Sequence, residues 1–211
     1  MELAATPRHE PFIWATWLAK VMSGRVNCQW QYWFQSHHKL LSKQPSTFDS
    51  LNWKIGHTRL LTELKQEVLA SGLQPRTEVS IKFELPGLDT RISGKADCLV
   101  VDGSNVMLYD CKTGHPHDSD RAQVMIYMYG LATLPQYASS RIRGTVVYRD
   151  GWVAVPDLSE TFESDLTFFA KLLSAYAEPQ REPGPDCALC NIHAVDCPDR
   201  PEPLAGAPER I

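Results

Sequence analysis

Two acidic side chains and one basic side chain stand in a largely apolar stretch of the chain, at Asp97, Asp110 and Lys112. The hydrophobic pattern of residues 91–131 predicts a strand, a tight turn, a second strand, a polar loop and a helix. Because successive strand side chains point to opposite faces, Asp110 and Lys112 share one face of the second strand. Carboxylates among Val and Leu residues are costly to desolvate unless a cation compensates them. The pattern therefore indicates a metal site.

A divalent cation at this position would suit phosphodiester hydrolysis, which needs neutralisation of the phosphate charge and a water of lowered pKa. Asp97 and Asp110 offer the hard oxygen ligands that Mg²⁺ or Mn²⁺ prefers, and Lys112 adds a positive charge beside the nucleophile. His57 would complete the ligands, and imidazole with carboxylates suits Mn²⁺ at least as well as Mg²⁺. A lone histidine on an apolar helix face is more often a core residue, but the strand carboxylates favour ligation.

Simpler interpretations exist for the polar residues of this stretch. Asp110 and Lys112 could form a salt bridge on an exposed strand, but the flanking Val and Leu residues indicate a buried strand, where an ion pair alone is an unreliable stabiliser. Gln123 and Tyr127 lie one turn apart on the predicted helix, so both belong to one face. Their simpler interpretation is a polar residue near the helix start and a core aromatic.

The elements that must position these side chains follow from periodicity and from stop signals. Residues 11–24 have helical spacing, and a second short helix begins near Cys28 and packs three aromatic residues on the core: Trp30, Trp33 and Phe34. A long helix is predicted from an N-cap at Asp49 or Ser50 to Ala70, with His57 on its apolar stripe. Three strands then follow, at about residues 76–85, 91–101 and 106–112.

A helix over about residues 119–133 carries Gln123 and Tyr127, and a hairpin is predicted around Asp150-Gly151. Asp157 and Glu160 are spaced as a capping box that opens a last helix. Its apolar stripe predicts packing on the core: Phe162, Leu166, Phe169, Leu173 and Tyr176.

Composition is that of a globular chain, with 211 residues, 43% hydrophobic and 22% charged. This length suits one well-buried domain with an appendage. A net charge of -4 gives no global attraction to nucleic acid, so DNA contact requires a local basic groove. No leader pattern or membrane-spanning run is present, so we expect a cytoplasmic protein without a membrane partner.

The six cysteines, without a secretion signal, indicate metal binding or buried thiols rather than structural disulfides. Cys187, Cys190 and Cys197 form C-x2-C-x6-C, and Cys28 stands far upstream. Three clustered thiols and one distant partner suit a tetrahedral metal or a [4Fe-4S] cluster. Structural Zn²⁺, with His193 as a possible ligand, and free thiols are the alternatives. The remaining two alternate away from the acids and are expected to be buried small hydrophobes: Cys98 and Cys111.

Four short motifs occur in a defined order: G-H at Gly56-His57, G-x-x-D from Gly94 to Asp97, D-x-K from Asp110 to Lys112, and Q-x-x-x-Y from Gln123 to Tyr127. Together they resemble the RecB-type branch of the PD-(D/E)XK nucleases, over about residues 50–135. The resemblance implies an α/β (α+β) fold with a restriction-endonuclease-like core, in which helices flank a mixed central sheet.

The resemblance also implies roles for six residues. They are His57, Asp97 and Asp110 as metal ligands, Lys112 with both aspartates in catalysis, and Gln123 and Tyr127 in holding DNA or the active site. Glu78 resembles an upstream acidic position of the branch, although a strand surface residue explains it equally well.

The branch includes iron–sulfur nucleases, among them CRISPR-associated exonucleases and a helicase–nuclease subunit, with one N-terminal and three C-terminal cysteines. This chain has that layout, with one extra residue in the last spacing. The resemblance implies a [4Fe-4S] cluster that holds a helical N-terminal segment to a C-terminal loop. The implied organisation is N-terminal helices with one cluster cysteine (1–48), a nuclease core (49–178), a cysteine loop (179–200) and a disordered tail (201–211).

The expected activity is that of a metal-dependent DNA nuclease acting on single-stranded DNA or DNA ends, with exonuclease favoured over endonuclease, in repair, recombination or defence. A helicase, an integrase or another DNA-processing protein is the expected kind of partner. The alternatives are a catalytically silent DNA-end-binding subunit and a zinc-stabilised interaction module. Candidates for phosphate contacts, each of which could also be a solvated surface charge, are Arg25, Lys54, Arg59, Arg121, Arg141 and Arg143.

Overall fold

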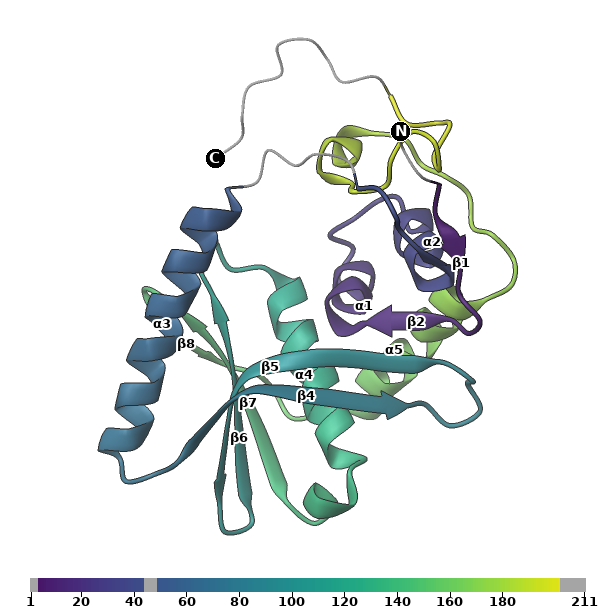
Figure 1. Cartoon of the computed structure of the whole chain (residues 1–211). Coiled ribbons are helices and arrows are strands. Elements are labelled where there is room, and N and C mark those ends of the chain that lie inside the picture. Colours follow the sequence, from purple (N-terminus) through teal and green to yellow (C-terminus); the bar gives the residue numbers. More distant parts are fainter. Residues whose placement is uncertain (1–3, 44–48, 202–211) are drawn as a thin grey trace.

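A computed structural model describes residues 4–43 and 49–201 (Figure 1). The helices are α1 (Ala15–Met22), α2 (Trp30–His37), α3 (Ser50–Ala70), α4 (Asp118–Ala132) and α5 (Glu160–Ser174), with short 3-10 helices η1 (Pro135–Tyr137) and η2 (Pro185–Leu189). The strands are β1 (Thr6–Pro7), β2 (Phe12–Trp14), β3 (His38–Lys39), β4 (Pro75–Glu84), β5 (Arg91–Asp102), β6 (Asn105–Lys112), β7 (Arg141–Tyr148) and β8 (Gly151–Ala154). β1 and β3 pair by themselves.

The central sheet has six strands in the order β2-β5-β6-β7-β8, and β4 pairs with β5 as well. β2–β5 and β6–β7 are parallel, whereas β4–β5, β5–β6 and β7–β8 are antiparallel. The sheet is therefore mixed and flanked by helices, which confirms the predicted fold class at this level.

The edge of β5 that faces β2 and β6 is interrupted. β2 pairs with residues 91–93 and β6 with residues 98–102. Between them, in the described part of the chain, residues 94–97 have no strand partner on that edge. In Figure 1 the β4–β5 pair accordingly runs away from β6 and β7. We call this interruption the sheet gap, and it coincides with the predicted G-x-x-D motif.

Helices cover both faces of the sheet. α3 packs through Leu60, Leu64 and Val68 on the face that carries Cys98 and Cys111. These two thiol side chains are almost fully buried, as predicted. The other face carries the larger core, which α1, α4 and α5 cover. Since strand side chains alternate, Asp110 and Lys112 belong to the α4 face with Val106 and Leu108. Asp97 stands where β5 changes its facing, between Ala96 of the larger core and Cys98 of the α3 face.

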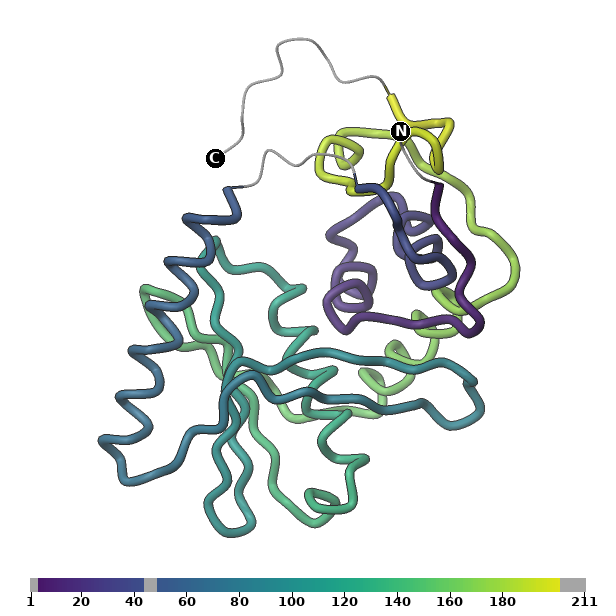
Figure 2. Tube along the Cα trace, viewed as in Figure 1, coloured from purple at the N-terminus to yellow at the C-terminus, as the bar shows by residue number. Residues whose placement is uncertain are grey.

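The N-terminal helices lie against the C-terminal loop, as the trace in Figure 2 shows. The indole N–H of Trp30 donates to Glu178 at 2.6 Å, and that of Trp33 donates to the Ala175 carbonyl at 2.7 Å. The Ala5 amide donates to Asp196 at 2.9 Å. Segments from the two ends of the chain thus form one packed region.

Three local predictions were wrong. Phe12–Trp14 forms a strand beside β5 rather than the start of a helix. α5 takes Ser159 as its N-cap, whose hydroxyl accepts the Phe162 amide, in place of the predicted Asp157. Tyr176 lies beyond the end of α5 and is fully exposed, so the apolar stripe ends at Leu173.

The predicted boundaries of α3, β4, β5, β6 and α4 agree with the structure to within one or two residues. The predicted disordered tail lies outside the described residues except for Pro201. Among the described helices, none has the length and apolarity needed to span a bilayer.

Candidate active site

Asp97 lies at the sheet gap and takes part in closing it. Strand pairing between β5 and β6 ends at Cys98 and Tyr109. Beyond this last pair, the Asp97 carboxylate, next to Cys98 in β5, accepts a hydrogen bond from the Cys111 amide of β6 at 2.7 Å. A buried amide without a partner is costly, so this hydrogen bond replaces the missing strand contact. The acid is thereby fixed between the diverging strands.

His57 reaches Asp97 from α3. Its Nε2 lies 3.1 Å from the Asp97 carboxylate, and both side chains are about one-fifth exposed. The hydrogen bond to Asp97 raises the pKa of His57, and burial opposes this effect. The Trp53 ring stacks on the imidazole with centroids 5.1 Å apart. The predicted ligand therefore lies beside the acid, oriented by a neighbouring aromatic ring.

Asp110 is the most buried acid of the site, at 2% exposure. Burial raises its pKa to about 6, and the nearby Lys112 opposes that rise. Lys112 Nζ lies 2.6 Å from Asp110 Oδ2 as an ion pair. Among the described residues, Oδ2 nevertheless has no hydrogen-bond partner of good geometry. The Lys112 ammonium is therefore the cation that compensates this buried carboxylate in the protein.

Lys112, Gln123 and Tyr127 form a chain of hydrogen bonds next to Asp110. Lys112 Nζ donates to Gln123 Oε1 at 3.2 Å, and Gln123 Nε2 donates to the Tyr127 hydroxyl at 2.8 Å. Gln123 Nε2 also lies 3.5 Å from Asp110 Oδ1. Burial alone would lower the pKa of Lys112, but Asp110, Asp120 and Asp97 together outweigh it and raise that pKa. The lysine is therefore held as an ammonium beside the acid.

Gly94 makes room for this chain. A Cβ at residue 94 would overlap the ring of Tyr127, which also has a backbone hydrogen bond with Lys95. Gly56 differs, since a Cβ there would contact only the Thr113 side chain at an ordinary 3.5 Å. Steric overlap with Tyr127 thus explains why the G-x-x-D motif has glycine at residue 94, whereas no steric overlap requires glycine at residue 56.

Glu78 lies in β4 between the residues that pair with Ala96 and Cys98, so it stands level with Asp97. Its φ of 53° is unusual for a strand residue. The carboxylate is 67% exposed and lies 3.5 Å from Lys95 Nζ. The structure thus pairs this acid with a surface lysine rather than with the acids of the sheet gap.

The described residues contain no group of three or more His, Cys, Asp or Glu side chains that is arranged to hold a metal ion. His57 and Asp97 form one pair, and Asp110 forms another with Lys112. By type, two carboxylates and an imidazole suit Mg²⁺ or Mn²⁺. Of the three candidate metal ligands, His57 and Asp97 are therefore in contact with each other, whereas Asp110 contacts Lys112.

None of the four cysteines of the predicted cluster forms a disulfide, and Cys28 is buried whereas the others are half-buried. Burial raises the pKa of Cys190, and Cys187 and Cys28 lie close enough to raise it further. Cys197 is influenced in the same way by Cys190 and Cys187. One region thus holds the four thiols, although the arrangement of the described residues is not that of a metal centre.

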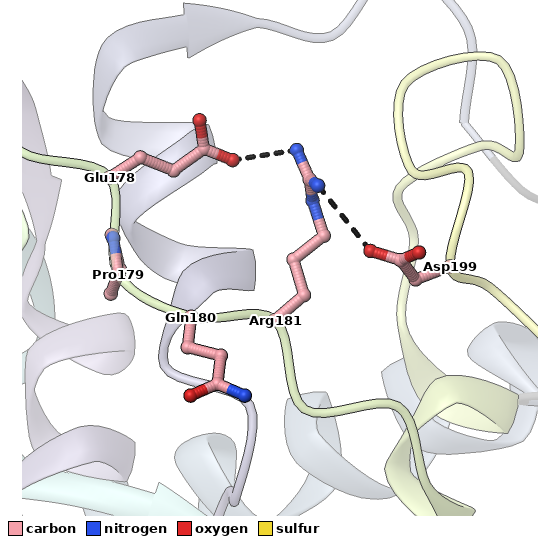
Figure 3. Close-up of a pocket in the computed structure, with 5 residues that line it drawn as sticks. All are labelled: Glu178, Pro179, Gln180, Arg181 and Asp199. Carbon is pink, nitrogen blue, oxygen red and sulfur yellow. Dashed lines mark hydrogen bonds and ion pairs between the residues drawn. The ribbon is translucent and has the colours of Figure 1, made fainter.

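Two arginines that the sequence analysis did not single out hold this region together. Arg200 donates to three loop carbonyls at 2.7 to 3.1 Å: Cys187, Cys190 and Ile192. Figure 3 shows Arg181 between Glu178 and Asp199, at 2.6 and 3.3 Å, in a hollow of about 490 Å³. Its guanidinium also lies 4.6 Å from the Trp30 ring centroid. The sequence signal that could have identified Arg181 and Arg200 is their position close to the clustered cysteines.

Comparisons with known proteins agree with this fold. A family model described as the PD-(D/E)XK nuclease superfamily matches residues 16–198, which include every predicted site residue. The crystal structure of SSO0001 is similar with a TM-score of 0.54 and 16% sequence identity, over 92% of this chain and 89% of that chain. At this identity the likeness concerns the fold alone. No curated protein matches the chain.

Proposed function

Because the chain belongs to the PD-(D/E)XK nuclease superfamily, whose members use divalent metals such as Mg²⁺, we propose that it is a metal-dependent deoxyribonuclease of the RecB-type branch. The observation that carries the proposal is the buried carboxylate of Asp110 next to an ammonium. A lone Asp–Lys pair at this depth is a poor stabiliser. The free energy spent on burying Asp110 and Lys112 is understandable if these two groups act on a phosphodiester.

His57, Asp97 and Asp110 would hold a divalent ion, which would neutralise charge on the scissile phosphate and lower the pKa of a water. Lys112 keeps its proton and places positive charge where negative charge develops in the transition state. Gln123 orients the ammonium through its Oε1 atom, and Tyr127 fixes Gln123 in turn. Because a histidine ligand must be neutral, His57 would have to be in its uncharged form to hold the ion.

We further propose that the substrate is single-stranded DNA or a DNA end, that cleavage is exonucleolytic, and that the protein serves repair, recombination or defence beside a helicase, an integrase or another DNA-processing partner. The support is the ordered set of four motifs that resembles the RecB-type branch. With a net charge of -4, contact with DNA must depend on local cations near the site.

The four thiols are proposed to bind a [4Fe-4S] cluster, with Zn²⁺ as the alternative. Their gathering in one region supports this, and so does the docking of the loop on the N-terminal helices. Protein purified without oxygen should contain iron and absorb in the visible range, and Cys190→Ser should lose that absorbance and some thermal stability. If the wild type contained neither iron nor zinc and Cys190→Ser had unchanged thermal stability, the proposed cluster would be wrong.

The nuclease proposal is tested by incubating the protein with Mn²⁺ and single-stranded DNA labelled at either end. We expect cleavage by the wild type, loss of more than a hundredfold in Lys112→Ala and Asp110→Ala, and unchanged cleavage in Asp150→Ala, a control in the exposed β7–β8 turn. Wild-type binding without cleavage would instead favour the DNA-end-binding subunit. Products released from one labelled end identify exonucleolytic action.

A further inference from the structure

Two cations, Lys20 and Arg25, lie where α1 meets the start of α4. Lys20 occupies the last turn of α1, and Gly24, with a φ of 65°, turns the chain so that the Arg25 amide donates back to the Lys20 carbonyl at 3.0 Å. The Arg25 guanidinium donates to the Ser119 hydroxyl at 3.0 Å. The Arg25 side chain is therefore held by Ser119, and the Lys20 ammonium lies 6.0 Å from the centroid of the Tyr32 ring.

Among the described residues, no acidic side chain forms an ion pair with Lys20 or Arg25. Burial lowers the pKa of Lys20, and both Arg25 and Lys112 lower it further. Asp120 opposes them, but its carboxylate already accepts the His117 amide and the Tyr148 hydroxyl, each at 3.0 Å.

Lys112 connects this positive region to the active site. It lies between Asp110 and Gln123 and is close enough to Lys20 for their charges to interact. The first turn of α4, which holds Ser119, is one turn ahead of Gln123 on the same helix. A strand whose scissile phosphate lies beside Lys112 would therefore have an adjacent phosphate near the α1–α4 junction.

We propose that Lys20 and Arg25 form a second phosphate-binding position, which takes a phosphodiester of the substrate strand next to the scissile one. This inference rests on the proposed nuclease function and adds a binding position to it. The anion supplies a counter-charge for the two cations, and charge-assisted contacts to phosphate oxygens are strong. Bound in this way, the strand is held in register with Lys112.

The test uses oligonucleotides in which one phosphate is replaced by an uncharged methylphosphonate, scanned along the positions next to the cut. For Lys20→Ala and Arg25→Ala we expect KM to rise about tenfold with little change in kcat, and the slope of log affinity against log salt to fall by about 1 per cation. With the methylphosphonate at the proposed position, wild type and variants should behave alike. Lys171→Ala, an exposed cation in the last turn of α5, should change nothing.

Ser119→Ala separates the charge from the fold, because it removes the anchor of Arg25 and keeps both cations. It should raise KM less than Arg25→Ala does, at similar thermal stability. An unchanged KM and salt slope in the double variant Lys20→Ala/Arg25→Ala would overturn the proposal, and so would variant effects that persist on every methylphosphonate substrate. A wild type that binds but does not cleave contradicts the nuclease function alone, since the salt slope of binding in the presence of a chelator still tests this position.

Discussion

At the scale of single residues, the site combines one costly group with several that hold it in place. Asp110 is an acid at 2% exposure whose pKa burial raises to about 6. Its neighbours Lys112 and Gln123 limit how far the carboxylate can move. Asp97 and His57 are more accessible and hold each other by a hydrogen bond. Such an arrangement sacrifices stability for a reactive geometry.

The raised pKa of Asp110 predicts a pH dependence of stability. The unfolded carboxyl titrates at its ordinary 3.8 and the folded one at about 6. Between these values the folded state binds more protons, so the metal-free wild type should lose stability as pH rises. Asp110→Asn should lack this loss. The free energy of unfolding of the variant, measured with urea, should therefore increase relative to that of the wild type from pH 4 to pH 7. Parallel curves for the two proteins would contradict the burial of a charged Asp110.

Trp53 predicts an effect on metal affinity without a direct contact to metal. Its ring stacks on His57, and residues that orient a ligand typically change metal affinity by tenfold or more. Trp53→Ala should therefore raise the Mn²⁺ concentration for half-maximal cleavage about tenfold. Trp152→Ala is the matched control, since Trp152 is 47% exposed against 46% for Trp53 and contacts Tyr109 instead. Equal effects of the two variants would show that the stack does not orient His57.

At the scale of elements, the sheet gap and the close approach of α4 create the site. β5 is paired with β4 along most of its length but changes partner from β2 to β6 on its other edge. The gap between these partners is filled by side chains: Asp97 bonds the Cys111 amide, and Tyr127 of α4 lies against Gly94. α4 can therefore lie close to β5 because residue 94 is a glycine.

Gly94→Ala should destabilise the protein by about 1–3 kcal/mol, because the new methyl group overlaps the Tyr127 ring in a well-packed core. The other motif glycine supplies the control. Gly56→Ala contacts Thr113 only at 3.5 Å and lies within α3, where Ala is the better helix former by about 1 kcal/mol. Urea denaturation should therefore show opposite signs for the two variants, and similar destabilisation by both would refute the steric explanation.

Much of this element arrangement could be predicted from the sequence. Periodicity located α3, β4, β5, β6 and α4 because each has a long amphipathic or alternating pattern with clear stop signals. Phe12–Trp14 was misassigned because three residues cannot distinguish the two periodicities. The sheet gap was beyond prediction, since it depends on which strands meet on the far edge of β5. Residue types likewise indicated the site, and Asp110 and Lys112 pair as their shared strand face allows. The contact of His57 with Asp97 is instead set by the tertiary packing of α3 on the sheet.

At the scale of the whole molecule, the two ends of the described chain are joined by buried contacts. Ile192 of the cysteine loop is fully buried, and the loop accepts the Asn27 amide through Asp186. Trp30 contacts both Glu178 and Arg181. The loop thus has protein contacts that do not require a metal, and a bound cluster would add to them.

Arg200→Ala should loosen the cysteine loop, because three carbonyls lose a charged donor. Hydrogen bonds to charged groups are worth about 1.5–3 kcal/mol, so a local loss of about 2 kcal/mol or more is expected. Limited proteolysis should cut the variant within residues 182–199 faster than the wild type. Arg149→Ala, at the exposed β7–β8 turn, should be cut like the wild type. If Arg200→Ala resisted proteolysis equally well, the carbonyl contacts would not be what orders the loop.

The sheet gap has a consequence for how the site adapts to its ion. Asp97 and Asp110 stand on adjacent strands just beyond the last ladder contact, so their spacing is not imposed by main-chain pairing. One side-chain hydrogen bond to Cys111 and the contact with His57 hold Asp97 instead. A small torsional rotation of the Asp97 side chain can therefore change the separation of the two carboxylates while every strand stays paired. If these acids hold the proposed divalent ion, we expect the site to adjust to ions of different radius without a change in strand pairing.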